Sequence, residues 1–172
     1  RQMCIRDRKK TVIIYGTSTG TCEDLAGRIG AKLGVDNIIN VTDMDDSVIA
    51  DNDNLILGTS TWGAGEVQDD WYDGIKVIKN ADLSGKTVAL FGCGDSESYP
   101  DTFVGGMAEI YNAVKKAGAN VIGAVATDGY TFDESESVVD DKFVGLALDE
   151  VNEDGKTDER IDAWVAEIKP NL

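Results

Sequence analysis

The chain has no histidine and only three cysteines, Cys4, Cys22 and Cys93. The absence of histidine removes the commonest general base, the Ser-His catalytic arrangements and the zinc sites that need an imidazole ligand. Three cysteines without a C-x-x-C pair argue against an iron–sulfur cluster, which usually needs four thiolates. We expect no metal site. A sparse, odd set of thiols is typical of a reducing compartment, so we expect a cytoplasmic protein.

Long apolar runs and positive charge are also scarce. No segment approaches the ~18 apolar residues of a membrane-spanning helix. Lys and Arg total 16 against 32 Asp and Glu, which gives a formal net charge of −16. This charge argues against nucleic acids and anionic membranes as partners and favours basic proteins.

The length of 172 residues, 42% of them hydrophobic, suits one domain with a buried core. Residues 1–8 show neither a strand period nor a secretory hydrophobic segment. We expect a non-native extension there and a single domain over residues 9–172.

Apolar runs alternate with helical patterns along this domain. Repeated β-α units predict an α/β, doubly wound three-layer sandwich around a five-stranded parallel sheet, in the order 2-1-3-4-5. The acidic stretch 127–157 is expected to be an insertion in the last strand, with residues 143–148 pairing as an extra strand. Thr157 is the predicted N-cap of the last helix. The predicted strands cover 11–15, 38–41, 55–59, 87–91 and 121–125, and the predicted helices carry apolar series within 22–33, 45–50, 67–78, 103–114 and 161–168.

The turn after the first predicted strand is rich in hydroxyl groups. Since a helix begins there, its first N–H groups and the positive end of its dipole favour a phosphate. The turn lacks the lysine of a nucleotide-hydrolysing P-loop and the three-glycine spacing of dinucleotide sites. Neutral donors suit a tightly held cofactor, although a polar, well-capped turn without a ligand is the alternative. The residues of this turn are Thr17, Ser18, Thr19, Gly20, Thr21 and Cys22.

Two further loops leave the same predicted edge of the sheet, and each carries an aromatic residue. Taken alone, Trp62 is more typical of a partly buried core position, and Tyr99 could equally lie on the surface. Together with the first turn, the two rings could flank a flat aromatic ligand whose phosphate lies at residues 17–22. The second loop contains Thr59, Ser60, Thr61, Trp62, Gly63, Ala64 and Gly65, and the third contains Cys93, Gly94, Asp95, Tyr99, Asp101 and Phe103.

From about residue 9 to residue 172 the chain resembles flavodoxins of the long-chain type. The turn at 17–22 resembles the [TS]-x-T-G-x-T phosphate motif, and the runs Thr61-Trp62-Gly63-x-Gly65-Glu66 and Gly94-Asp95-x-x-x-Tyr99 resemble the two isoalloxazine loops. Residues 143–150, followed by Arg160 and Trp164, resemble the long-chain insertion and terminal helix.

This resemblance implies non-covalent FMN and one-electron transfer between redox proteins, by a carrier rather than an enzyme. Residues 17–21 would hold the phosphate, Trp62 and Tyr99 would lie on the inner and outer faces of the ring, and Asp95 would meet the pyrimidine edge. Cys22 stands where the motif ends in threonine. One hydroxyl contact is therefore lost there, while the backbone N–H stays.

The resemblance also implies how the protein tunes the flavin. Gly63, which tolerates positive φ, would let the peptide after Trp62 turn over and stabilise the neutral one-electron-reduced flavin. Nearby carboxylates would make the fully reduced ring a strong reductant by repelling its negative charge, unless solvent screens them. The expected partners are basic redox proteins, of the flavodoxin or ferredoxin reductase type, and downstream acceptors. We expect the protein itself to be a monomer. The carboxylates concerned are Glu66, Asp69, Asp70, Asp95, Glu97 and Asp101.

Two other functions fit the same predicted fold. An FMN-dependent NAD(P)H quinone or azo-compound reductase would need room for the nicotinamide, which Trp62 and Tyr99 would block. A receiver-type signalling module would need carboxylates directly after the first strand, whereas that strand ends in Tyr15-Gly16-Thr17-Ser18.

Overall fold

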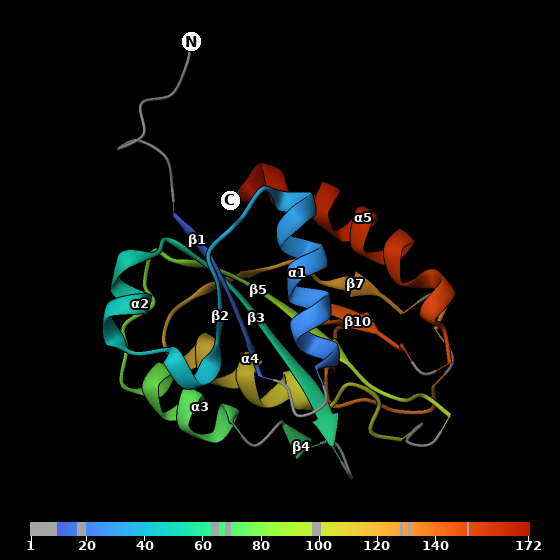
Figure 1. Ribbon diagram of the computed structural model, residues 1–172. Helices are drawn as coiled ribbons and strands as arrows, with labels where there is room; N and C mark the ends of the chain where they lie inside the picture. The colour runs from blue at the N-terminus through green and yellow to red at the C-terminus, as the bar shows by residue number, and fades with distance from the viewer. Residues whose placement is uncertain are drawn as a thin grey trace.

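The computed structural model describes residues 10–16, 20–62, 66–67, 70–97, 101–127, 129–130, 132–150 and 152–172, with the backbone alone at 61, 62, 66 and 67. The predicted extension at 1–8 lies outside these residues. Strands and helices alternate along the described chain (Figure 1). The strands are β1 (Thr11–Gly16), β2 (Ile38–Asn40), β3 (Asn54–Trp62), β4 (Glu66–Val67), β5 (Thr87–Cys93), β6 (Asn120–Ile122), β7 (Val125–Ala126), β8 (Val138–Val139), β9 (Lys142–Phe143) and β10 (Leu146–Leu148). The helices are α1 (Thr21–Leu33), α2 (Asp46–Asp51), α3 (Trp71–Lys79), α4 (Gly106–Lys116) and α5 (Thr157–Ile168), with short 3-10 turns η2 (Val41–Asp43), η3 (Asp154–Lys156) and η4 (Lys169–Asn171).

The main sheet is parallel apart from the short strand β4. Its order is β2-β1-β3-β5, and β5 is flanked on its other side by β6 and β10. Since β6 and β10 share the fifth position, this is the predicted order 2-1-3-4-5. The prediction of a doubly wound sheet is confirmed.

Helices α1 and α5 cover one face of this sheet, and α3 and α4 cover the other (Figure 1). Along β1, Ile13 faces the apolar side chains of α1 and α5, while its neighbours Val12 and Ile14 face those of α3 and α4. Both faces are therefore buried, as continuous apolar strands require. Two buried tryptophans anchor the layers, because Trp71 Nε1 donates to Gly58 O at 2.7 Å and Trp164 Nε1 donates to Gly123 O at 2.9 Å.

The fifth strand position corrects the prediction for residues 121–148. β6 ends at Ile122 and pairs with the first half of β5, whereas Val125 belongs to a small antiparallel sheet in the order β7-β9-β8. Phe143 also belongs to that small sheet, so 143–148 is not one extra strand. Residues 146–148 instead complete the fifth position, with Leu148 opposite Cys93.

Three helix starts also differ from the prediction. Phe103 lies in the turn before α4, which begins only at Gly106. Val67 lies in β4, paired with Thr61, and α3 begins only at Trp71. Thr157 is the first residue of α5 and makes no capping hydrogen bond; the 3-10 turn η3 precedes it instead. No helix within the described residues is both long and apolar enough to cross a membrane.

Candidate functional site

The carboxyl ends of four neighbouring strands meet at one edge of the sheet. Gly16 lies opposite Thr59, which lies opposite Gly92, and Cys93 lies opposite both Ser60 and Leu148. The chain leaves β1 toward α1 on one face and leaves β3 toward α3 on the other (Figure 1). This divergence is the switch point at which doubly wound sheets bind ligands. The three predicted loops begin at this edge.

The first turn places the start of a thirteen-residue helix beside β1. Gly20 is the N-cap of α1 with φ +90°, a left-handed conformation that glycine adopts without strain. A Cβ built at Gly20 would have no atom within 4 Å, so the backbone there borders open space. The helical ladder begins with Asp24 N–H donating to Gly20 O at 3.0 Å, which leaves Cys22 in the first turn, where N–H groups bind anions. This geometry fits a phosphate. Thr17, Ser18 and Thr19 lie outside the described residues.

The thiol of Cys22 faces the core rather than the turn. Its side chain is fully buried, and its Sγ lies 3.5 Å from Sγ of Cys93, at the end of β5. The hydrogen bond with Cys93 and burial both raise the pKa of Cys22 well above its ordinary value, so the thiol is protonated at neutral pH. Any contact from Cys22 to a phosphate therefore uses the backbone N–H.

The second loop begins as a hairpin. β3 continues through Thr61 and Trp62, and Trp62 pairs with Glu66 of β4. Thr59 is buried, and its hydroxyl donates to Ser60 O at 2.9 Å. The backbone of Trp62 is thus held by strand pairing rather than by a free loop. Gly63, Ala64 and Gly65 lie outside the described residues.

The third loop follows β5 and is tied to β10. Gly94 N–H donates to Leu148 O at 3.0 Å, and Glu97 N–H donates to the Asp95 carboxylate at 3.2 Å. Asp101 is exposed at the far end of the loop. Tyr99 lies outside the described residues.

Phe103 closes the third loop from inside the protein. Its side chain is only 1% exposed and packs against three aromatic rings of the insertion, with centroid distances of 5.7 to 6.2 Å. The hydroxyl of Ser137 also donates to Val104 O at 2.7 Å. The ring supports the turn before α4, and a contact between this ring and a cofactor stays a prediction. The partner rings are Tyr130, Phe132 and Phe143.

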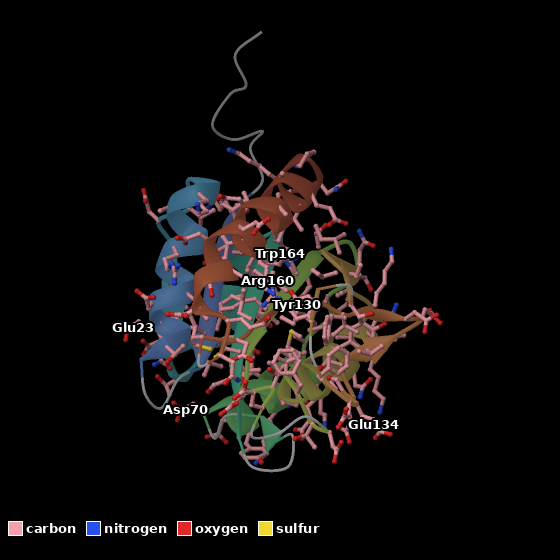
Figure 2. The ribbon with its side chains drawn as sticks, turned by 90° about the vertical axis from the view of Figure 1, so that its right-hand side faces the viewer. Glu23, Asp70, Tyr130, Glu134, Arg160 and Trp164 are labelled. Atoms are coloured by element: carbon pink, nitrogen blue, oxygen red, sulfur yellow. The ribbon has the colours of Figure 1, made fainter. Side chains whose placement is uncertain are left out.

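The insertion is fastened to α5 by one arginine. Figure 2 shows Arg160 beside Tyr130, with Trp164 further along the same helix. The guanidinium carbon lies 3.9 Å from the centroid of the Tyr130 ring, and Nη2 donates to Gly129 O at 3.0 Å. Burial raises the pKa of Tyr130 to about 12, although Arg160 acts in the opposite direction. The phenol therefore stays neutral and donates to Ala147 O at 2.7 Å.

Asp149 also lies at this edge, although the sequence pattern did not predict it there. It directly follows β10, is fully buried, and accepts a hydrogen bond from Ser96 N–H in the third loop at 3.1 Å. The available signal was a carboxylate immediately after an apolar strand. It was missed because residues 146–148 were predicted as an extra strand and not as a neighbour of β5.

The fold and this edge define a doubly wound α/β domain that presents a helix N-terminus and two further loops to one ligand. A family model described as Flavodoxin matches residues 13–164. The chain belongs to the flavodoxin family.

Individual relatives agree with this assignment. The chain is 42% identical over 163 residues to flavodoxin 1 of Azotobacter vinelandii, covering 91% of this chain and 94% of that protein. It is 41% identical over 164 residues to the flavodoxin of a Picosynechococcus species, covering 94% and 96%. The crystal structure of Fusobacterium nucleatum flavodoxin bound to flavin mononucleotide superposes with a TM-score of 0.89 at 35% identity, covering 96% of this chain and 99% of that one.

Proposed function

We propose that this protein is a one-electron carrier that binds FMN non-covalently and serves enzymes as a redox partner without being an enzyme itself. The supporting observation is the single sheet edge at which the α1 N-terminus and the loops after β3 and β5 meet. The relatives named above are flavodoxins, which disfavours the quinone or azo-compound reductase. Bound FMN would supply the single-electron chemistry, and the protein would set its environment.

Each loop has a distinct role in this proposal. Residues 17–22 hold the phosphate through hydroxyl and N–H groups, with Gly20 at the helix N-terminus. Trp62 and Tyr99 enclose the ring, and Asp95 lies at its pyrimidine edge. The insertion between β6 and β10 supports the assignment to the long-chain type.

The charge of the molecule indicates the kind of partner. Acidic residues surround the proposed flavin edge, where Glu97 and Asp101 are exposed. Figure 2 shows Asp70 and Glu134 near the end of the molecule at which β3 finishes. With a net charge of −16, a monomer of this kind would dock basic redox proteins and repel nucleic acids and anionic membranes.

The two described thiols support a cytoplasmic location. Cys22 and Cys93 are free although their sulfurs lie only 3.5 Å apart. Close thiols persist most readily in a reducing compartment.

Anaerobic stepwise reduction of the FMN-loaded protein, followed by visible absorption, tests the proposed function. We expect a yellow protein that turns blue and then colourless, because the flavin would accept its electrons one at a time. A protein that goes from yellow to colourless in one two-electron step would support the reductase instead. A protein that stays colourless after addition of FMN would overturn FMN binding altogether.

The substitution Cys22→Thr is expected to tighten FMN binding by about three- to tenfold, which is about 0.7–1.4 kcal/mol. Threonine carries a methyl group and a hydroxyl on Cβ, so the methyl can occupy the buried position of the thiol while the hydroxyl turns toward the phosphate. Fluorescence titration of the apoprotein with FMN measures the Kd. Cys22→Val is the matched control, because valine has the shape of threonine without the hydroxyl. Equal Kd values for the two variants would contradict this role.

A further inference from the structure

The carboxylate of Asp149 joins two loops at the proposed flavin edge. It is fully buried and accepts hydrogen bonds from Ser96 N–H at 3.1 Å and from the Ser96 hydroxyl. It also accepts from Asn152 N–H at 2.9 Å and from Asn152 Nδ2 at 3.0 Å. One side chain thus holds the loop after β5 and the loop after β10 together.

The sheet dictates this arrangement. Leu148 of β10 lies opposite Cys93 of β5, so the two chains leave the sheet side by side. Gly94 N–H then bonds to Leu148 O at 3.0 Å, which brings the next residue, Asp149, beside the third loop. The contact between Asp149 and Ser96 follows directly from the parallel pairing.

The network continues to Asp95. Nδ2 of Asn152 donates to Oδ1 of Asp95 at 2.8 Å, and Glu97 N–H donates to the same oxygen at 3.2 Å. The N–H groups of Gly94, Ser96 and Glu97 are all bonded within this network. The backbone from Gly94 to Glu97 is therefore held in part by the chain at and after β10 and in part by the Asp95 carboxylate.

The energetics make this link rigid. A buried carboxylate is costly unless several donors compensate its desolvation. Burial alone would raise the pKa of Asp149, but the hydrogen bonds from Ser96 and Asn152 lower it below the ordinary value. The charge-assisted bonds thus hold an ionised group in place, and removing either partner leaves buried donors or a buried charge unsatisfied.

We propose that Asp149 and Asn152 are positioning residues that hold Asp95 and its loop against the pyrimidine edge of FMN. This inference rests on the proposed function. The chain after β10 would then help to set the affinity for FMN and the reduction potentials of the flavin without contacting the flavin itself. When the network breaks, the loop moves and water enters, so the reduced anionic ring is better stabilised.

The test compares Asp149→Asn and Asn152→Ala with Asp154→Asn in the FMN-loaded protein. Asp154 is exposed on η3 in the same segment, so its replacement removes one charge without disturbing the network. We expect the Kd for FMN to rise about tenfold or more in Asp149→Asn and less than about twofold in the control. Both network variants should also give a less negative second one-electron potential than the control, measured by anaerobic titration against reference dyes.

The outcomes separate the possible failures. If the folded variants keep the Kd and potentials of the control and lose only thermal stability as apoproteins, the network is merely structural and the proposal is wrong. If Asp149→Asn does not fold, Asn152→Ala decides, because it removes the hydrogen bond from Asn152 to Asp95 and leaves the bonds between Asp149 and Ser96. If the unmodified protein itself binds no FMN, the proposed function fails first, and the role of these two residues toward FMN fails with it.

Discussion

Replacement of Gly145 by alanine should lower the stability of the apoprotein by about 3 kcal/mol, which corresponds to a fall in Tm of about 6–12 °C. Gly145 lies between β9 and β10, where the chain comes close beside Leu90 of β5. A Cβ at this position would lie 2.2 Å from Leu90 O and 2.7 Å from Leu90 C. Those atoms belong to the backbone of the central sheet, so they cannot rotate away as a side chain could. The strand β10 would have to shift, and with it Asp149.

Gly27→Ala is the matched control for this prediction. Gly27 is exposed in the middle of α1, and a Cβ there would have no atom within 4 Å. Since alanine is the better helix former by about 1 kcal/mol, the same chemical change should raise the Tm by about 2–4 °C. Thermal unfolding of the two apoproteins, followed by circular dichroism, measures both shifts. A Tm for Gly145→Ala within about 1 °C of the unmodified protein would show that β10 can move without cost.

The fifth strand position could not be predicted from the sequence, because its pairing depends on contacts across the fold. The earlier strands are continuous apolar runs, such as Val12, Ile13 and Ile14, and their burial on both faces is a local property of the pattern. β6 and β10 are three residues each, and both occupy one strand position although residues 123–145 separate them. Which fragment pairs with which half of β5 depends on contacts across the fold. No periodicity within the fragments contains that information.

The predicted start of the last helix, α5, was wrong for a related reason. Thr157 has the residue type of an N-cap, followed by acidic residues, and this favoured a helix start one residue later than the observed one. The chain enters α5 through the turn η3, where Lys156 N–H bonds to Glu153 O at 2.9 Å. The side-chain ion pairs of Glu153 with Lys156 and Arg160 accompany this turn. Local propensity is a weak guide where such contacts decide the backbone.

Cys22 shows how two correct patterns can overlap. The helical series places it on the apolar face of α1 with Leu25 and Ile29, and the phosphate motif places it in the first turn of the helix. The structure satisfies both, because the thiol joins the core while the N–H group lies in the first turn. The sequence alone could not identify Cys93 as the neighbour of this thiol, since 71 residues separate them.

Electron transfer with a basic redox partner should slow by about tenfold or more between low and high salt. Between about 0.01 and about 1 M ionic strength the Debye length falls from about 30 to about 3 Å, which removes the attraction between the acidic edge and the partner before contact. Stopped-flow mixing with a basic flavoprotein reductase gives the second-order rate constant. Reduction of an uncharged quinone by the same protein should change little with salt. A rate with the reductase that is indifferent to ionic strength would contradict electrostatic steering.

Two variants can show whether the place of an acidic residue matters for the rate, or only the net charge of the protein. Asp101→Lys and Asp51→Lys each change the net charge by two units, and both side chains are exposed. Asp101 follows β5 at the proposed flavin edge, whereas Asp51 precedes β3 at the opposite end of the sheet. If the partner docks at the flavin edge, Asp101→Lys should slow the reaction at low salt several-fold more than Asp51→Lys, and the difference should vanish at high salt because screening removes both effects. Equal slowing by the two variants would mean that only the total charge guides the encounter, and the electron would then have no preferred exit at this edge.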